Sequence, residues 1–496
     1  MSSTSPSTAT EVSYGSRVTQ IAGERPDNVD LVIIGRDGFE RGVSWRELET
    51  RSNQIAHRLV ELGAGKGSVV ALALATCAEH VFVTIAIWKL GGTVLPLRHD
   101  MPQWEMDRLL DIAEPALLVT EQHDASCPVL GLSALAVTDT ISPEPPPDAI
   151  SDCINWVASS GSTGKPKLIV AAERGVVATE PTLAAIRGNA SITLVTSPLY
   201  HLNGFAYTAR GLLEGCRVYV MEKFDAAQFV ELVPRYGIEL TVMVPTMLQR
   251  VARLPEATPD KFSSIKRLIY GGATVPEWVV DRWLELIEPE AFLFTYGSSE
   301  RLGFAVMTGA EWPDHRGSTG KVMGAELSVR DANGNPVPTG EVGEIFMRPT
   351  AEGPTFAYLG MPTPEPTPDG FRSVGDLGYL DDDGYLYIAD RRTDMIITGG
   401  ANVFPAEVES ALSEHPGVID QVVVPVPDDE WGHRVHAIIQ PADAANPPTS
   451  EELRAWCKER LASYKAPKTY EIVDRVPRTE AGKVNRTNLG EDRGAT

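Results

Sequence analysis

Short apolar segments alternate with amphipathic ones from Leu31 to Gly400, and this alternation constrains the fold more than any other feature. Val69–Ala73 and Val94–Leu97 are typical of buried strands, whereas Trp45–Leu62 and His80–Leu90 have helical spacing. A strand–helix repeat of this kind predicts α/β layers with mostly parallel strands and helices packed on the sheets.

The pattern changes after Arg392, which indicates a second domain. Glu407–Leu412 and Glu451–Ala462 have helical spacing, and Gln421–Pro425 is typical of a strand. At about 100–200 residues per domain, a chain of 496 residues holds roughly three structural units. We therefore expect a disordered leader over residues 1–13, a large N-terminal domain of stacked, mostly parallel sheets over residues 14–392, and a small, mobile α+β domain over residues 393–496.

Composition excludes several classes of function. The formal net charge is −23, which argues against nucleic acids and anionic membranes as partners. The polar leader lacks the apolar core of a signal peptide, and no run of about 18 apolar residues predicts a membrane span. The five cysteines are scattered without a CxxC pair, which indicates reduced thiols, a cytoplasmic location and no zinc site.

A loop rich in glycine and hydroxyl residues, Ser159–Lys167, ends in two lysines separated by a proline. Small residues let backbone amides approach an oxyanion, and lysines add charge, so the loop suits a polyphosphate. Its spacing is not that of a Walker loop, because Gly161 and Gly164 are too close together. Taken alone, the loop fits a solvated turn equally well. A preceding strand, Ile154–Val157, would present it.

Further segments carry candidate chemistry, and each also has a plain structural interpretation. Glu300 follows a tight turn and suits Mg²⁺ beside phosphates, or is a surface glutamate at a capped turn. Asp376, after a glycine, suits ribose hydroxyls, although Gly-Asp is usually only a turn. Arg391 could pair with the same nucleotide or be solvated. Lys483 follows Gly482 on a terminal loop, where a lysine is usually exposed.

Together these segments resemble the acyl-adenylate-forming superfamily, which includes acyl-CoA synthetases, luciferase and peptide-synthetase adenylation domains. The resemblance spans nearly the whole chain. It rests on segments that occur in the family's order: Ser159–Lys167, Tyr296–Glu300, Gly375-Asp376, Asp390–Ile397, Gly399–Glu409, Tyr464–Pro467 and Gly482-Lys483.

The resemblance implies a two-step reaction in which a carboxylate attacks the α-phosphorus of ATP and a thiol then captures the adenylate. It implies ATP, Mg²⁺ and CoA, or a pantetheinyl carrier protein, as cofactors. Lys483 would bridge the carboxylate and the α-phosphate, Glu300 would hold Mg²⁺, and Asp376 with Arg391 would bind the ribose. The remaining nucleotide and pantetheine positions would be Ser160, Gly161, Ser162, Thr163, Gly164, Lys167, Gly272, Ala273, Tyr296, Gly297, Ser298, Ser299, Gly399 and Gly400.

The chain departs from the family pattern at two places. The hinge between the two domains usually carries Asp or Lys two residues after the arginine, but this chain has Thr393 there and Asp394 next. Leu168 stands where a glycine commonly follows the last lysine of the loop. Neither departure removes a charged group assigned a role.

The acid is indicated by Pro198–Phe205, which resembles the segment that gates the acyl pocket. His201 is the candidate gating and catalytic residue there, with a buried core histidine as the alternative. No acidic residue lies between Thr196 and Arg210, which disfavours an α-amino acid. We expect an aryl or alicyclic acid, as in aryl and bile-acid CoA ligases, a role in secondary metabolism, and a monomer or homodimer.

Three alternatives remain open from the sequence. The acceptor could be the pantetheine arm of a carrier protein. The activated group could be a non-carboxylate oxyanion such as nitrite, captured by an aryl amine in a diazotisation. The chain could also be a nucleotide sensor without turnover, which the retained Glu300, Asp376 and Lys483 disfavour.

Overall fold

The computed structural model describes residues 11–135, 140–160, 166–171, 173–177, 186–350, 356–479, 482 and 484–494. Internal contacts divide the chain into two compact units. The first unit comprises Met1–Asp225, Arg235–Val242 and Pro354–Thr363, and the second comprises Ala226–Pro234, Met243–Gly353 and Pro364–Thr496. Among the described residues, every helix is too short or too polar to cross a lipid bilayer.

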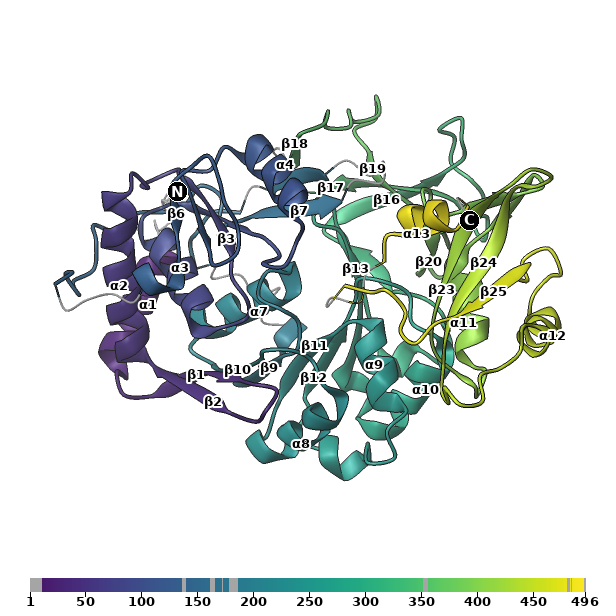
Figure 1. The fold of residues 1–496 in the computed structure, drawn as a ribbon, viewed down its shortest axis with the longest axis horizontal. Helices are drawn as coiled ribbons and strands as arrows, with labels where there is room; N and C mark the ends of the chain where they lie inside the picture. Colours follow the sequence, from purple (N-terminus) through teal and green to yellow (C-terminus); the bar gives the residue numbers. More distant parts are fainter. Residues whose placement is uncertain are drawn as a thin grey trace, which may run out of the picture. The chain divides into compact units, whose positions relative to one another are not determined.

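The first unit has the predicted α/β layering (Figure 1). Its helices are α1 (Tyr14–Glu24), α2 (Trp45–Glu61), α3 (Ala78–Lys89), α4 (Gln103–Ala113), α5 (Leu132–Leu135) and α7 (Leu202–Leu213). Its strands are β1 (Val29–Ile34), β2 (Glu40–Ser44), β3 (Val69–Ala73), β4 (Thr93–Pro96), β5 (Leu117–Thr120), β6 (Val129–Leu130), β7 (Trp156–Ser160), β8 (Pro166–Ala171), β9 (Ile192–Val195), β10 (Arg217–Met221), β18 (Phe356–Leu359) and β11 (Leu240–Met243), whose last residue belongs to the second unit.

Parallel pairing dominates two sheets of the first unit. β1 pairs with β10, β10 with β9 and β9 with β11, all in parallel, and β2 adds an antiparallel edge. The second sheet pairs β4, β3, β5 and β6 in parallel. The predicted strand Val69–Ala73 is confirmed as β3, and the predicted helices Trp45–Leu62 and His80–Leu90 are confirmed as α2 and α3 to within two residues.

The third sheet of the first unit, formed by β18, β8 and β7, flanks the predicted phosphate loop, and the predicted start of β7 was wrong. The strand expected at Ile154–Val157 begins at Trp156 and runs to Ser160, pairing antiparallel with β8. Ile154 is instead bound to other elements, because its carbonyl accepts from the Trp88 indole at 2.9 Å and from the Val94 amide at 3.2 Å.

The second unit contains α8 (Ala226–Tyr236, all but its last two residues), α9 (Pro245–Ala252), α10 (Glu277–Leu286), α11 (Pro405–Ser413), α12 (Ser450–Arg460) and α13 (Arg486–Gly494). Its strands are β12 (Arg267–Tyr270), β13 (Phe292–Gly297), β14 (Phe304–Thr308), β15 (Lys321–Met323), β16 (Ala325–Arg330), β17 (Gly343–Pro349), β19 (Arg372–Leu380), β20 (Leu386–Arg391), β21 (Ile396–Thr398), β22 (Ala401–Val403), β23 (Val418–Asp428), β24 (Gly432–Pro441) and β25 (Thr469–Ile472). Short 3₁₀ turns cover Pro259–Phe262, Pro289–Ala291 and Gly309–Glu311.

Antiparallel pairing is more frequent in this unit than the sequence pattern indicated. β12 and β13 are parallel, but β14 and β15 continue them antiparallel, and β16, β17, β19 and β20 form a wholly antiparallel sheet. The turn Asp381–Gly384, whose Asp-Asp-Asp-Gly sequence is typical of a hairpin, joins β19 to β20, with the Gly384 amide donating to the Asp381 carbonyl at 3.1 Å. Short connections of this kind join antiparallel strands.

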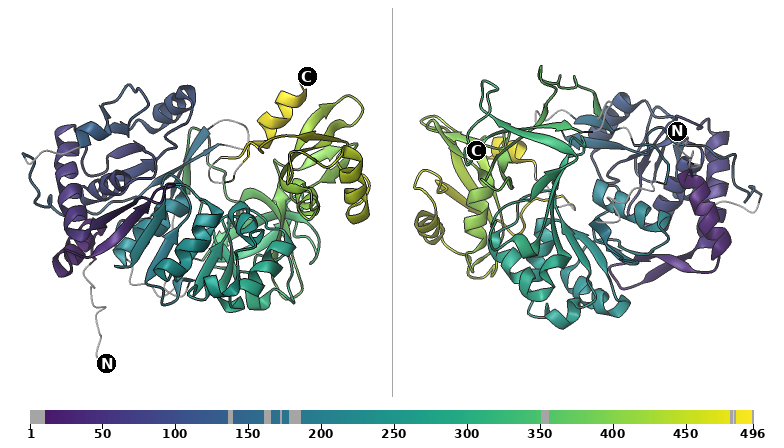
Figure 2. Two further views of the ribbon diagram at one scale, coloured as in Figure 1. Left: turned by 60° about the horizontal axis from the view of Figure 1, so that its bottom comes forward. Right: turned by 180° about the vertical axis from the view of Figure 1, so that it is seen from behind.

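β23 pairs with β24 at the end of the C-terminal sheet, and apolar layers cover both of its faces. Val418 and Val423 pack in one buried cluster with residues of α11 and α12, whereas Val422, Val424 and Val426 pack in another with Leu489 of α13. Figure 2 shows α13 at the C-terminus lying across this sheet. A strand buried on both faces reads as a continuous apolar run, which is why Gln421–Pro425 was predictable.

Candidate active site

Two parallel strands bring the segments 271–273 and 296–300 to one edge of their sheet. Tyr270, at the end of β12, pairs in register with Phe294 of β13, and the Thr295 hydroxyl donates to the Tyr270 carbonyl at 2.8 Å. Ligands of open α/β sheets bind beyond the carboxyl ends of such strands. The exposed Gly272 and Ala273 therefore lie beside the segment that begins at Tyr296.

Glu300 is a buried carboxylate in a tight turn just beyond β13. Its residue is only 6 % exposed. The turn is closed by the Arg301 amide, which donates to the Ser298 carbonyl at 3.1 Å, and Arg301 has a φ of 56°, a left-handed conformation uncommon for a residue with a Cβ atom. Strained backbone next to a buried charge is typical of a functional turn.

Asp376, on β19, is a buried carboxylate with two polar partners. It is 6 % exposed, the Tyr296 hydroxyl donates to its Oδ2 at 2.6 Å, and Arg391 Nε lies 3.4 Å from its Oδ1. Asp376 and Arg391 face each other across β19 and β20. The hairpin thus places the predicted ribose ligand and its predicted partner together, and Tyr296 joins them.

The electrostatics of this group are set by burial. Burial raises the pKa of Asp376, and the nearby Glu300 charge raises it further, while the Tyr296 hydrogen bond and the Arg391 charge oppose the rise. Burial and the Asp376 charge raise the pKa of Tyr296 far above its ordinary value, so the phenol stays a donor at neutral pH. The carboxylate is held in one orientation with capacity left to accept further hydrogen bonds.

The carboxylates of Glu300 and Asp376 suit a magnesium ion that binds together with a phosphate-bearing substrate. Over the residues that the structure describes, no group of three or more His, Cys, Asp or Glu side chains could hold a metal by itself. Mg²⁺ is typically bound by one or two carboxylates together with substrate phosphates. Glu300, buried near Asp376, fits that role.

The Gly399–Gly400 pair is the two-residue turn of the β21–β22 hairpin. Both glycines have positive φ, 55° and 82°, as a type I′ turn requires, and Thr398 pairs with Ala401 across them. Gly399 is also needed for space, since an added Cβ would lie 2.5 Å from the Trp431 ring. Trp431 is 41 % exposed, and the Lys468 amine lies 3.2 Å from its ring centroid.

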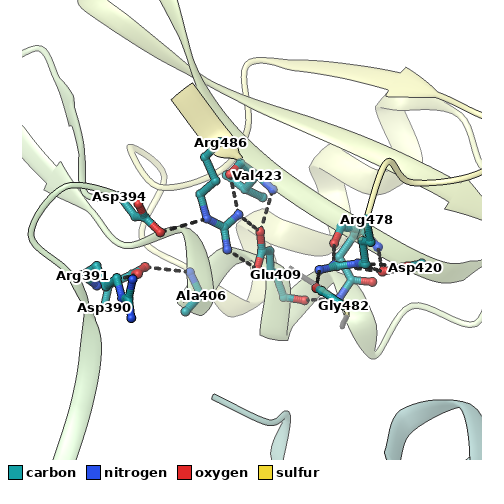
Figure 3. Close-up of polar contacts among 11 residues, drawn as sticks. Asp390, Arg391, Asp394, Ala406, Glu409, Asp420, Val423, Arg478, Gly482 and Arg486 are labelled. Carbon is teal, nitrogen blue, oxygen red and sulfur yellow. Dashed lines mark hydrogen bonds and ion pairs between the residues drawn. The ribbon is translucent and has the colours of Figure 1, made fainter. Parts of the chain in front are cut away.

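An ion pair and a hydrogen bond connect residues 390–394, where the hinge is predicted, to α13 and α11 (Figure 3). Arg486 Nε lies 3.5 Å from Asp394 Oδ2, and the Ala406 amide donates to Asp390 at 3.1 Å. Burial raises the pKa of Asp390 to about 6. Of the two candidate hinge residues, Asp394 is therefore the one with a charged partner in the C-terminal part.

The first unit holds the described part of the predicted phosphate loop. Ser159 and Lys167 face each other where β7 and β8 meet the loop, and the Lys167 amine lies 3.5 Å from the Tyr358 ring centroid. Such a cation–π contact holds the amine near its strand. The backbone of Ser160 ends β7.

His201 is the N-cap residue of α7 in the first unit. Its ring lies 4.6 Å from that of Tyr200, and its carbonyl accepts from the Phe205 amide at 2.8 Å. Gly204 allows the first turn of α7 to pack on the preceding segment, since a Cβ there would lie 2.1 Å from the Pro198 carbonyl oxygen. The histidine is therefore fixed at a helix start rather than carried on a free loop.

The structure brings Tyr296, Gly297, Ser298, Ser299, Glu300, Asp376 and Arg391 into one group within the second unit, with Gly272 and Ala273 on the neighbouring strand end. The predicted site residues Gly161, Ser162, Thr163, Gly164 and Lys483, and the side chain of Ser160, lie outside the described residues.

Sequence reasoning missed Trp431, Lys468, Arg478 and Arg486. Trp431 contacts Gly399, Arg478 donates to the Gly482 carbonyl, and Arg486 pairs with Glu409 and Asp394. Apart from Gly482, their partners are far away in sequence, so the sequence carried no local signal for these contacts.

Comparison with known proteins shows the family to which the chain is similar. The family model described as AMP-binding enzyme matches residues 18–352, and that of the AMP-binding enzyme C-terminal domain matches residues 407–483. A fatty acid–[acyl-carrier-protein] ligase of Streptomyces coeruleorubidus is 31 % identical over 480 residues, 90 % of this chain and 91 % of that protein. A feruloyl-CoA synthase of an Amycolatopsis species is 32 % identical over 463 residues, 89 % of this chain and 92 % of that protein.

A solved structure agrees with these matches over the length of the chain. The o-succinylbenzoate CoA synthetase from Bacillus subtilis, in complex with its acyl-adenylate intermediate, superposes with a TM-score of 0.78 at 25 % identity, covering 97 % of this chain and 99 % of that one.

Proposed function

This chain belongs to the AMP-binding enzyme family, and we propose that it activates a small aryl or alicyclic carboxylic acid with ATP and transfers the acyl group to the thiol of CoA. The buried Asp376 carboxylate, held by Tyr296 and Arg391 and lying near Glu300, is the observation that supports this most. A fixed, buried acceptor pair of this kind suits the vicinal hydroxyls of a ribose.

In the first step, a carboxylate oxygen of the acid attacks the α-phosphorus of ATP, the bond from that phosphorus to the bridging oxygen breaks, and pyrophosphate leaves. Asp376 accepts the ribose hydroxyls and orients the nucleotide, and Glu300 is the residue that would hold Mg²⁺. The metal, when bound, neutralises phosphate charge. Lys483 donates to the carboxylate and the α-phosphate, where negative charge gathers.

In the second step, the thiol attacks the carbonyl carbon of the acyl-adenylate. The carbon–sulfur bond forms, the bond from carbon to the phosphate oxygen breaks, AMP leaves, and the thiol proton is released. The Gly399–Gly400 turn and the Trp431 ring that packs on it form a flat apolar surface suited to a pantetheine arm. The Lys468 amine packs on the Trp431 ring and helps to fix its orientation.

His201 with Tyr200 is the proposed selector for the acyl group. Flat aromatic rings stack on aryl acids, and the feruloyl-CoA and o-succinylbenzoate relatives carry aryl acids in their names. The lack of an acidic side chain from Thr196 to Arg210 leaves an α-ammonium group without a partner there.

A carrier protein is the second candidate acceptor, because the Streptomyces relative is named as an acyl-carrier-protein ligase. The third candidate is activation of nitrite for capture by an aryl amine. It uses the same phosphate chemistry, so only a test of substrates distinguishes it from carboxylate activation.

One experiment distinguishes these candidates. Pyrophosphate release is measured with a panel of aryl, alicyclic and fatty acids and nitrite, each alone and with CoA, a pantetheinylated carrier protein or an aryl amine. We expect release with an aryl or alicyclic acid and a thioester only with CoA. Pyrophosphate release with nitrite and with none of the acids would favour nitrite activation instead. A thioester on the carrier protein but not on CoA would favour the carrier protein as acceptor.

A further inference from the structure

Two largely buried arginines lie on either side of Lys483 in the sequence, and both bind the same strand (Figure 3). Arg478 precedes the lysine by five residues and Arg486 follows it by three. Their side chains are each 14 % exposed, although arginine is normally a surface residue. Their partners explain why they are buried.

Arg478 connects β23 to the residue before Lys483. Its Nε donates to both carboxylate oxygens of Asp420 at 3.1 Å, and its Nη2 donates to the Gln421 carbonyl at 2.6 Å. Its Nη1 donates to the Gly482 carbonyl at 3.0 Å. One guanidinium thus ties Gly482 to a strand that is buried on both faces, using the forked donor geometry that lysine lacks.

Arg486 makes a similar connection on the other side of Lys483. It forms a bidentate pair with Glu409 of α11, with one distance of 3.0 Å, and donates to the Val423 carbonyl at 2.9 Å. Glu409 also accepts from the Val423 amide at 2.7 Å. Burial lowers the pKa of Arg486, but the charge of Glu409 and its hydrogen bonds outweigh burial and raise it, so the residue stays charged.

Gly482 itself has little freedom. Its amide donates to the Thr479 carbonyl at 2.8 Å, its φ is 74°, and an added Cβ would lie 2.6 Å from the Thr246 hydroxyl of α9. The backbone of Gly482, the residue before Lys483, is therefore fixed by Arg478, by its bond to Thr479 and by close packing together.

A lysine ammonium is a point charge on a flexible four-carbon chain, so its effect on a transition state depends on where its backbone is held. Catalytic groups must be placed within about 0.5 Å of the productive geometry by the residues around them. Charged hydrogen bonds to a rigid strand supply such placement.

We propose that Arg478 and Arg486 are positioning residues that hold the backbone on both sides of Lys483 against β23, so that the lysine can act in adenylation. This rests on the proposed function, in which Lys483 bridges the acid and the α-phosphate. The two arginines differ in reach. The contacts of Arg478 are with β23 and Gly482, whereas Arg486 also binds Glu409, which follows the Gly399–Gly400 hairpin on α11, and Asp394 at the hinge.

The two half-reactions test this difference. Arg478→Gln should lower the turnover number of acid-dependent ATP–pyrophosphate exchange by about 10- to 100-fold and leave thioester formation from a synthetic acyl-adenylate and CoA within about twofold of wild type. Arg486→Gln should lower both. Arg493→Gln is the matched control, because it removes an arginine of the same helix that pairs with Glu471 instead. Equal losses of both half-reactions in Arg478→Gln would overturn the positioning role.

A double-mutant cycle tests whether Arg478 acts through Lys483. Lys483→Ala should lower exchange by about 10²- to 10³-fold, and adding Arg478→Gln to that variant should cause no further loss. Additive losses would mean that Arg478 contributes by another route, which contradicts the proposal.

Hydrogen exchange of the unliganded protein tests the anchoring without any substrate. In Arg478→Gln the Gly482 amide should exchange faster than in wild type, while the amides of β23 and those of the Arg493→Gln control stay unchanged. An unchanged Gly482 amide would refute the anchoring. If wild-type protein shows no ATP–pyrophosphate exchange with any acid, the proposed function fails. The hydrogen-exchange rate of the Gly482 amide then still decides whether Arg478 holds the backbone before Lys483.

Discussion

Replacing Tyr296 by phenylalanine should weaken ATP binding without changing the shape of the site. The substitution removes the hydroxyl that donates to Asp376 Oδ2 at 2.6 Å and leaves the ring. Asp376 is only 6 % exposed, so water cannot freely take the place of the lost donor. A hydrogen bond to a charged group contributes about 1.5–3 kcal/mol, and its loss frees the carboxylate to turn and to protonate, so ATP affinity should fall by at most about 10- to 150-fold.

The same substitution should shift the pH dependence of binding. Burial raises the pKa of Asp376 and the Tyr296 hydrogen bond opposes this, so losing the bond raises the pKa further. The ionised carboxylate that accepts the ribose hydroxyls then forms only at higher pH. ATP affinity of the variant should therefore fall off on the acid side at a higher pH than that of wild type.

Calorimetric titration with a non-hydrolysable ATP analogue across the neutral and mildly acidic range measures both effects. Tyr379→Phe is the control, since Tyr379 lies on the same strand as Asp376 and stacks on Tyr387 at 4.7 Å. We expect unchanged affinity for the control. If Tyr296→Phe binds the analogue as wild type does, with the same acid limb, Asp376 is not the ribose ligand.

Three further predictions concern other parts of the chain. Gly399→Ala should slow thioester formation from a preformed adenylate by about tenfold or more and spare pyrophosphate exchange, because its Cβ would lie 2.5 Å from the Trp431 ring; equal slowing of both reactions would contradict this. Burial raises the pKa of Asp390 to about 6, so its protonated form stabilises the fold fully below pH 3.8, by at most about 3 kcal/mol, and this stabilisation is lost as pH rises through 6. In urea titrations between pH 3.8 and 6, Asp390→Asn should therefore make the free energy of unfolding depend less on pH than in wild type. His201→Ala should raise the KM for the acid by about tenfold and leave the KM for ATP unchanged, whereas a lowered melting temperature with unchanged KM values would identify a core histidine.

The elements that sequence predicted well are those whose signal is local. The apolar run of β3 and the helical spacing of α2 were read correctly because each depends on its own residues. The turn Asp381–Gly384 likewise has its own chemistry, and the hairpin it closes places Asp376 opposite Arg391.

Features that depend on distant partners could not be read in this way. The start of β7 shifted by two residues because Trp88 and Val94, far away in sequence, bind the Ile154 carbonyl. The antiparallel sheet that begins at β16 was not anticipated, since strand direction is decided by the length of the connections rather than by the apolar pattern.

In the candidate site, too, residues within local motifs were predictable from the sequence, whereas contacts between distant residues were not. Glu300 and Asp376 stand in motifs that a resemblance can carry residue by residue. The Tyr296 hydrogen bond to Asp376 spans 80 residues and the Arg478 bond to Asp420 spans 58, so both needed the fold.

Acid-dependent ATP–pyrophosphate exchange tests the central claim most directly, because it reports adenylation before any thiol is involved. With wild-type protein, Mg²⁺ and a panel of aryl and alicyclic acids, we predict exchange that requires the acid and that Lys483→Ala lowers by about 10²- to 10³-fold. Exchange that needs no acid, or that persists unchanged in Lys483→Ala, would contradict the account.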